Sequence, residues 1–207
     1  MLVEKMIRSS LLVVGILVAG MHASFAQDVT QEKVVIAHRG ASGYLPEHTL
    51  AAKALAYGMR ADYIEQDVVL SKDSIPVILH DIHLDATTDV AQKFPERARE
   101  DGRYYAIDFT LAEIKTLNVT ERFKADTGKQ VYADRFPGEF GIFKVPTLEE
   151  EIKLVKGLNH STGRDVGIYP EIKDPAFHRA EGQDITKTVI SVLEKWGYNN
   201  PASNAFV

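Results

Sequence analysis

The chain has 207 residues, of which 45% are hydrophobic and 26% are charged, a composition typical of a globular protein with one domain. The net charge of −5 and the lack of a dense Lys/Arg tract give no reason to expect a nucleic-acid partner. Because the chain has no cysteine, it cannot form disulfides, zinc–thiolate sites, a thiol nucleophile or a lipid-modified N-terminal cysteine.

Residues 1–26 have the layout of a cleavable signal peptide. Two basic residues precede an apolar run over residues 11–21, and small residues at Ser24 and Ala26 suit a signal peptidase. The alternative is a membrane anchor, but the run is shorter than the ~20 residues that a spanning helix needs. We therefore expect cleavage after Ala26 and a secreted or periplasmic protein with no stable membrane span.

The next segments alternate between strand and helix patterns. Apolar, β-branched runs predict strands over residues 34–38, 63–70 and 76–80. Between the first two, an Ala-rich segment over residues 49–57 predicts a helix that Gly58 ends. The order strand, helix, strand, strand, with apolar strands throughout, predicts an α/β protein with a mainly parallel sheet.

Residues 82–145 interrupt this alternation. The segment is polar, aromatic and rich in turns, and it is too long for an ordinary loop in a compact domain. Thr110 and Glu113 fit a capping box that opens a short helix through Leu117. We interpret the segment as an insertion that packs over one end of the domain.

Regular order resumes at Thr147. A second capping box predicts a helix to Leu158, and an apolar run over residues 166–172 predicts another strand. A further helix is expected from its cap at Asp184 to its end at Gly197. The residues of this helix expected to face inward are Ile185, Val189, Ile190, Val192, Leu193 and Trp196.

Residues 204–207 have the pattern of a strand that is just beginning. The helix–strand alternation is interrupted there, so we expect the chain to be truncated.

Three carboxylates lie near the ends of apolar strands. Glu65 and Asp67 are two residues apart on one strand, so their side chains point to the same face. Burying two carboxylates together is unfavourable unless a cation neutralises them, although the strand end could instead be solvated or an arginine could pair with both. Glu171 ends another apolar strand, and three carboxylates suit Mg²⁺ or Ca²⁺.

Four cationic or titratable residues complete this set. His38 and His80 each follow a predicted strand, and the cleavage of a P–O bond needs one group to accept a proton and another to donate one. Arg39 could bind a phosphate with its fork of donors, and Lys173 lies on the same face as Glu171. Each could instead have no catalytic role: the histidines could be structural, and Arg39 and Lys173 could be solvated surface charges. Together with the carboxylates they predict a metal-assisted phosphodiester-cleaving site.

Other polar residues near these motifs are weaker candidates. Glu47 could be a fourth metal ligand or a carboxylate in the first turn of a helix. Asp81 could orient His80 or face water. The sequence suggests no partner for His48, His83, His160 and His178.

The motifs resemble the glycerophosphodiester phosphodiesterase family, and segments between residues 84 and 111 and between 159 and 173 resemble its secreted, periplasmic branch. The resemblance covers essentially all of residues 33–207. The matching segments are His38-Arg39-Gly40, Pro46-Glu47-His48-Thr49, Glu65-Gln66-Asp67-Val68, His80-Asp81 and Pro170-Glu171-Ile172-Lys173. One departure is His48, where many relatives carry asparagine.

The resemblance implies a (β/α)₈ TIM barrel with a small inserted domain. It implies hydrolysis of a small-molecule glycerophosphodiester to sn-glycerol 3-phosphate and an alcohol. The acid/base pair that relatives use matches His38 and His80. Their metal-binding carboxylates match Glu65, Asp67 and Glu171. Their phosphate-binding arginine and lysine match Arg39 and Lys173. In this branch of the family the metal is usually Ca²⁺.

The length of the chain limits this interpretation. A barrel needs about eight strands, whereas residues 27–207 supply roughly four and the start of a fifth, so we expect the N-terminal part of the barrel domain, truncated after about half. Strand edges and apolar surface would then be exposed. Two other functions remain open: a related barrel phospholipase that acts on intact lipids, and a catalytically inactive surface or binding protein.

Overall fold

The centre of the fold is strand β2, Tyr63–Leu70, which lies in the middle of a four-stranded sheet in the described part of the chain. The computed structural model describes residues 33–136 and 141–207. The signal peptide expected over residues 1–26 therefore lies outside the described residues. All but the first residue of β2 are buried, as expected for a strand that is apolar on one face and covered on both.

Two of the three strand pairings are parallel. Strands β1, Ile36–Ala37, and β4, Gly167–Ile172, both run parallel to β2. Strand β3, Pro76–Ile78, turns back and pairs antiparallel with the C-terminal end of β2. The predicted α/β protein with a mainly parallel sheet is thus confirmed.

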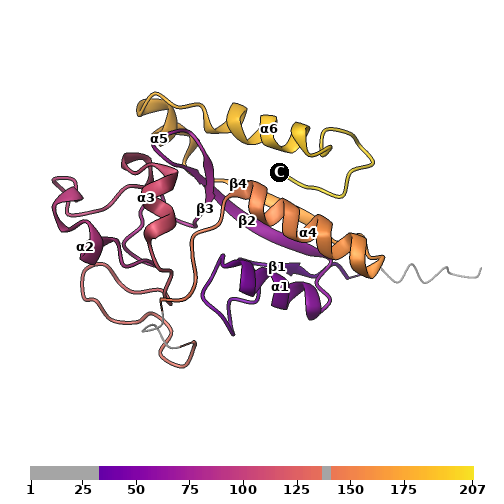
Figure 1. Ribbon diagram of the computed structural model, residues 1–207, viewed down its shortest axis with the longest axis horizontal. Helices are drawn as coiled ribbons and strands as arrows, with labels where there is room; N and C mark the ends of the chain where they lie inside the picture. Colours follow the sequence, from indigo (N-terminus) through magenta and orange to yellow (C-terminus); the bar gives the residue numbers. More distant parts are fainter. Residues whose placement is uncertain (1–32, 137–140) are drawn as a thin grey trace, which may run out of the picture. The chain divides into compact units, whose positions relative to one another are not determined.

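One face of the sheet is covered by helices α1 (Leu50–Gly58), α4 (Leu148–Thr162) and α6 (Ile185–Lys195), which lie along the strands in Figure 1. Their apolar stripes meet Ile64 and Val68 of β2 in a single buried core. The capping box predicted at Thr147 is present at the start of α4, and it fixes where that helix begins.

The other face of β2 carries polar side chains. Successive side chains of a strand alternate between its two faces, so Ile64 and Val68 enter the helical core while Glu65 and Asp67 point away from it. In the parallel pairing with β4, Glu65 lies opposite Tyr169 and Asp67 lies opposite Glu171. This register brings residues about a hundred positions apart in the sequence onto one polar surface.

The described residues of the 82–145 segment pack around a second apolar core, which includes Val69 and Val77 from the sheet. Its described part contains two short α-helices, α2 (Val90–Lys93) and α3 (Leu111–Thr116), and two 3₁₀ turns at Pro95–Arg97 and Ala106–Asp108. The capping box predicted at Thr110 is present at the start of α3.

The structure differs from the expected elements at four places. β1 is shorter than the predicted strand, and Val34 and Val35 are more than half exposed, because β2 is the only strand that β1 pairs with among the described residues. On α6, Ile190 is 39% exposed, whereas it was expected to face inward. A short helix α5, Pro175–Ala180, was not predicted. The strand expected at residues 204–207 is reduced to one bridge, between Ala205 and Ile168.

Gly40 is required by the loop that carries His38 and Arg39. Its φ is +80°, and an added Cβ would lie 2.9 Å from the backbone carbon of Ala52 in α1. We expect Gly40→Ala to lower the free energy of unfolding by roughly 2–4 kcal/mol, since it adds both strain and a clash with backbone.

Gly43 provides the matched control for this prediction. A Cβ added there would meet nothing within 4 Å, so Gly43→Ala should change the free energy of unfolding by less than about 0.5 kcal/mol. Denaturant unfolding of both variants measures the difference. Equal stabilities would show that the loop adapts without cost.

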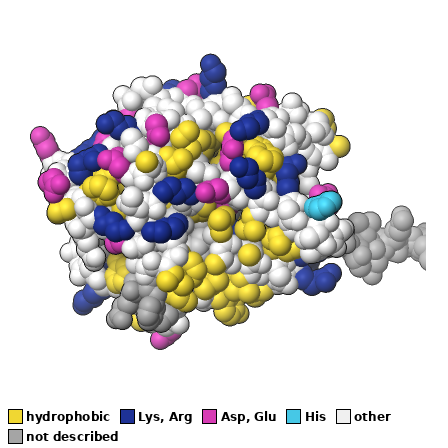
Figure 2. All heavy atoms as spheres, in the orientation of Figure 1, with side chains coloured by type: hydrophobic (Ala, Val, Ile, Leu, Met, Phe, Trp, Pro, Cys, Tyr) yellow, Lys and Arg dark blue, Asp and Glu magenta, His cyan; other side chains and the backbone are white. Residues whose placement is uncertain are grey.

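Figure 2 shows hydrophobic side chains gathered on the part of this face where Figure 1 places α1. Leu55 of that helix is 37% exposed, and Met59, which follows its last residue, is 55% exposed. Among the described residues, no helix has both the length and the apolar character needed to cross a bilayer.

Candidate functional site

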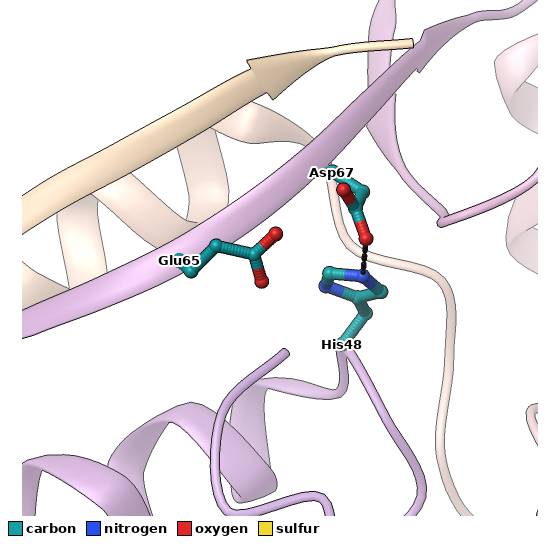
Figure 3. Close-up of side chains that lie close together, drawn as sticks. All are labelled: His48, Glu65 and Asp67. Carbon is teal, nitrogen blue, oxygen red and sulfur yellow. Dashed lines mark hydrogen bonds and ion pairs between the residues drawn. The ribbon is translucent and has the colours of Figure 1, made fainter. Parts of the chain in front are cut away.

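The site is built on the two carboxylates of β2. Glu65 and Asp67 are 2% and 0% exposed, and their side chains point to the same side of the strand, toward His48 (Figure 3). Glu65 Oε1 and Asp67 Oδ1 have no hydrogen-bond partner in residues 33–136 and 141–207. A buried anionic oxygen without a donor is unfavourable, so the pair is suited to a hard cation with oxygen ligands.

The pKa values of the two carboxylates are shifted in opposite directions. Burial and the neighbouring negative charge of Asp67 raise the pKa of Glu65 well above its usual range. Burial also acts to raise the pKa of Asp67, but a hydrogen bond from His48 and the charge of Lys173 outweigh it and bring the pKa below its usual range. Two adjacent carboxylates cannot both ionise easily without a counter-charge.

A cation could supply this counter-charge. One potential ligand atom from each of His48, Glu65 and Asp67 lies within 4.8 Å of the others, so a possible metal-binding site is present here.

Arg39 and Lys173 lie on either side of Asp67. Arg39 Nε is 3.6 Å from Asp67 Oδ2, and Lys173 Nζ is 3.4 Å from Asp67 Oδ1. The backbone of Arg39 has a φ of 61°, and its N–H donates to Glu65 Oε2 at 2.5 Å. The structure therefore brings both predicted phosphate-binding residues to the carboxylate pair, with their positive charges next to the candidate cation position.

Glu171 lies beside this pair but is oriented differently. It is the register partner of Asp67 in β4, yet its side chain is 55% exposed and its Oε1 accepts a hydrogen bond from Lys173 Nζ at 2.6 Å. Its role as a third metal ligand stays a prediction. Its position at the rim would let the carboxylate turn toward a cation without being buried beforehand.

The two predicted acid/base histidines share one electrostatic environment. Burial and the charge of Arg39 lower the pKa of His38, and the charges of Asp67 and His80 also act on it. His38 is exposed, whereas His80 is partly buried and its Nδ1 lies 2.8 Å from Asp81 Oδ1. Because an ionised carboxylate can only accept a hydrogen bond, Nδ1 of His80 carries the proton. Nε2 of His80 is therefore available to exchange a proton with a substrate.

Arg122 was not identified from the sequence. It comes from the 82–145 segment, and its guanidinium donates to both carboxylate oxygens of Glu47, at 2.6 and 3.1 Å, and to Asp81 Oδ2 at 2.6 Å. Asp81 in turn holds His80. The segment thus contributes a side chain to the support of a candidate catalytic histidine, and no local motif around Arg122 indicates this.

The carboxylate of Glu47 forms ion pairs with two arginines. Besides Arg122, Arg39 Nη1 lies 3.3 Å from both of its carboxylate oxygens. Burial acts to raise the pKa of Glu47, but the hydrogen bond and charge of Arg122 lower it overall. Its predicted role as a fourth metal ligand remains a prediction, and the observed contacts are those of an ion-paired carboxylate.

Sequence comparison relates the chain to known proteins. The profile of the glycerophosphoryl diester phosphodiesterase family matches residues 38–204. A glycerophosphodiester phosphodiesterase of Haemophilus influenzae is 50% identical over 98% of the chain and 57% of its own length. One of Treponema pallidum is 44% identical over 91% of the chain and 53% of its own length. The chain therefore spans about half the length of the curated relatives it matches.

Solved structures give the same relationship. A putative glycerophosphoryl diester phosphodiesterase of Silicibacter pomeroyi is 27% identical with a TM-score of 0.62, over 80% of the chain and 55% of that structure. A phosphodiesterase of Oleispira antarctica, solved with its product sn-glycerol-3-phosphate, is 27% identical with a TM-score of 0.54, over 84% of the chain and 56% of that structure. The predicted barrel fold class is confirmed by these neighbours.

Proposed function

Because this chain belongs to the glycerophosphoryl diester phosphodiesterase family, we propose that the whole protein hydrolyses glycerophosphodiesters to sn-glycerol 3-phosphate and an alcohol. The observation that carries the proposal is the pair of buried carboxylates, Glu65 and Asp67, with Arg39 and Lys173 within 3.6 Å of Asp67. Adjacent negative and positive groups of this kind suit a divalent cation together with a phosphate diester.

We propose Ca²⁺ as the cation, with Glu65 and Asp67 as its ligands and Glu171 as a third. The carboxylate-only oxygen set suits Ca²⁺, although Mg²⁺ prefers similar oxygen donors. When bound, the cation supplies positive charge that polarises a phosphoryl oxygen. Glu65 Oε1, which is buried and has no hydrogen-bond partner among the described residues, supports this assignment.

The remaining groups of the site would bind the substrate and move protons. Arg39 and Lys173 can donate hydrogen bonds to the phosphoryl oxygens, where negative charge increases in the transition state. His80, with Nδ1–H held by Asp81, presents Nε2 for one proton transfer. His38 provides the second histidine, and the two would act as the acid and base at opposite sides of the phosphorus.

Measuring the release of sn-glycerol 3-phosphate from glycerophosphocholine, with Ca²⁺ and with a chelator, tests the proposal. We expect release that Ca²⁺ supports and the chelator abolishes. Diacylglycerol release from lipid bilayers would indicate the related phospholipase instead. If neither this chain nor an extended chain of the relatives' full length released sn-glycerol 3-phosphate, a non-catalytic binding protein would be favoured.

We also propose that the protein is exported. Basic residues followed by an apolar run and by small residues at Ser24 and Ala26 support this in the sequence. N-terminal sequencing of the mature protein should begin at Gln27, and the presence of earlier residues would contradict cleavage.

A further inference from the structure

A lysine is buried directly behind the carboxylate pair. Lys53 belongs to α1 and is 1% exposed, among the largest fully buried side chains of the described residues. Its Nζ donates to the backbone carbonyl of Glu65, lies 3.2 Å from His48 Nδ1 and lies 3.4 Å from Glu151 Oε2 on α4. An ammonium has three N–H groups and no acceptor; the contacts with Glu65 and His48 are hydrogen bonds, and the contact with Glu151 is an ion pair.

The position of Lys53 follows from the end of β1. The pairing of β1 with β2 stops at Ala37, opposite Ile64 and one residue before Glu65. The carbonyl of Glu65 receives the Lys53 ammonium instead, and a buried carbonyl without a donor would be unfavourable. Glu151 is the fully buried ion-pair partner of Lys53; burial raises its pKa to about 7, and the charge of Lys53 opposes this shift.

The lysine determines the tautomer of His48. Because Nζ only donates, His48 Nδ1 must accept, and the ring proton must lie on Nε2. Nε2 lies 2.8 Å from Asp67 Oδ2, which therefore accepts a hydrogen bond from Nε2–H.

We infer that Lys53 and His48 are positioning residues for the cation site: Lys53 fixes the tautomer of His48, and His48 Nε2–H holds the Asp67 carboxylate in place. The inference rests on the proposed function in one respect, the cation at Glu65 and Asp67. Hydrogen bonds from outside the metal ligands often orient those ligands, and their loss typically lowers metal affinity 10- to 100-fold.

The competing arrangement is His48 as a direct metal ligand, since its ring lies within 4.8 Å of both carboxylates. A ligand nitrogen needs a free lone pair. Nδ1 uses its lone pair on Lys53, and Nε2 carries the proton. Ligation by Nε2 would require the opposite tautomer, which would leave Lys53 facing an N–H. The two arrangements therefore predict opposite effects of removing the lysine.

The test uses the full chain with both members of the buried pair replaced, Lys53→Met together with Glu151→Leu. Replacing both charges by apolar groups of similar size avoids leaving one charge buried alone. Glu151→Gln is the matched control, because it keeps Lys53 and its bond to His48, and its amide oxygen can still accept a hydrogen bond from the Lys53 ammonium. A second pair, His48→Gln and His48→Leu, compares a side chain whose amide can still donate to Asp67 with one that cannot. Circular dichroism melts establish that each variant folds.

Calorimetric titration with Ca²⁺ gives the first readout. The double variant and His48→Leu should bind about 10- to 100-fold more weakly than wild type, while Glu151→Gln and His48→Gln stay within a few-fold. Wild-type affinity in the folded double variant would overturn the inference and leave the proposed function intact. Wild-type protein that binds no divalent cation would instead overturn the cation site itself.

The ¹⁵N spectrum of the histidines in the metal-free protein gives the second readout, which needs neither cation nor activity. The His48 ring, assigned by its loss in His48→Gln, should show a protonated Nε2 and an unprotonated Nδ1. In the double variant this pattern should be lost or mixed. A protonated Nδ1 in the wild-type protein would overturn the inference whatever the titration shows.

Discussion

Glu65→Ala should abolish divalent-cation binding in calorimetry and, with it, chelator-sensitive turnover. Glu65 supplies one of the two buried carboxylates that β2 contributes to the cation site, and the affinity of an oxygen site for Ca²⁺ depends on the number of charged ligands. We expect the affinity to fall by more than about 100-fold, because the loss of a ligand should exceed the 10- to 100-fold effect of losing a supporting hydrogen bond.

The surface carboxylate Glu149, which pairs with Lys195, is the control for this prediction, and Glu149→Ala should bind normally. Full cation affinity in Glu65→Ala would show that the site lies elsewhere. The pH dependence adds a check. Because burial and Asp67 raise the pKa of Glu65, protons compete with the cation, and wild-type affinity should weaken as pH falls from 8 to 6.

His38→Ala should lower kcat by about 10²- to 10⁴-fold, the usual contribution of a general acid or base. The side chain is exposed and makes no side-chain hydrogen bond within the described residues, so the variant should fold normally and keep its Ca²⁺ affinity. Steady-state kinetics at saturating Ca²⁺, together with calorimetry, separate these effects. Unchanged kcat would remove His38 from the mechanism.

His160→Ala is the matched control, since His160 is an exposed histidine near the end of α4. The dependence of activity on pH gives an independent test of this role for His38. Burial and the charge of Arg39 lower the pKa of His38 below 6.5, so its ring is neutral at pH 7 and able to accept a proton. If His38 is the base, activity at saturating Ca²⁺ should fall as the pH drops below that pKa, and this acid limb should disappear in His38→Ala.

Local sequence signals predicted the parts of the fold that depend on neighbouring residues. The bounds of β2 are those expected from its apolar run, and the capping boxes at Thr110 and Thr147 begin helices where predicted. The exposure of Val34 could not be predicted, because a β-branched run has the same pattern at a sheet edge as at its centre. Only the number of paired neighbours distinguishes the two positions.

The candidate site was predictable where the functional side chains lie close together on one strand, as Glu65 and Asp67 do. It was missed where two distant segments meet, as at Arg122. A signal for the buried pair did exist: Lys53 lies among the inward positions of α1, and Glu151 lies in the apolar stripe of α4. Opposite charges on two buried helix faces indicate that the faces meet. His48 lacked such a signal, since its partners follow only from the packing of α1 against β2.

The parallel pairing of β2 with β4 has a consequence for synthesis. Asp67 and Glu171 become neighbours only through this pairing, and a ribosome that adds roughly 5–20 residues per second needs roughly 5–20 seconds to make the intervening segment. During that interval the β4 edge of β2 is unpaired in the nascent chain, and such edges invite aggregation. The polar face of β2 would then reduce the apolar surface that this strand exposes before β4 is made. The same pair of carboxylates would thus act first in biogenesis and later in binding.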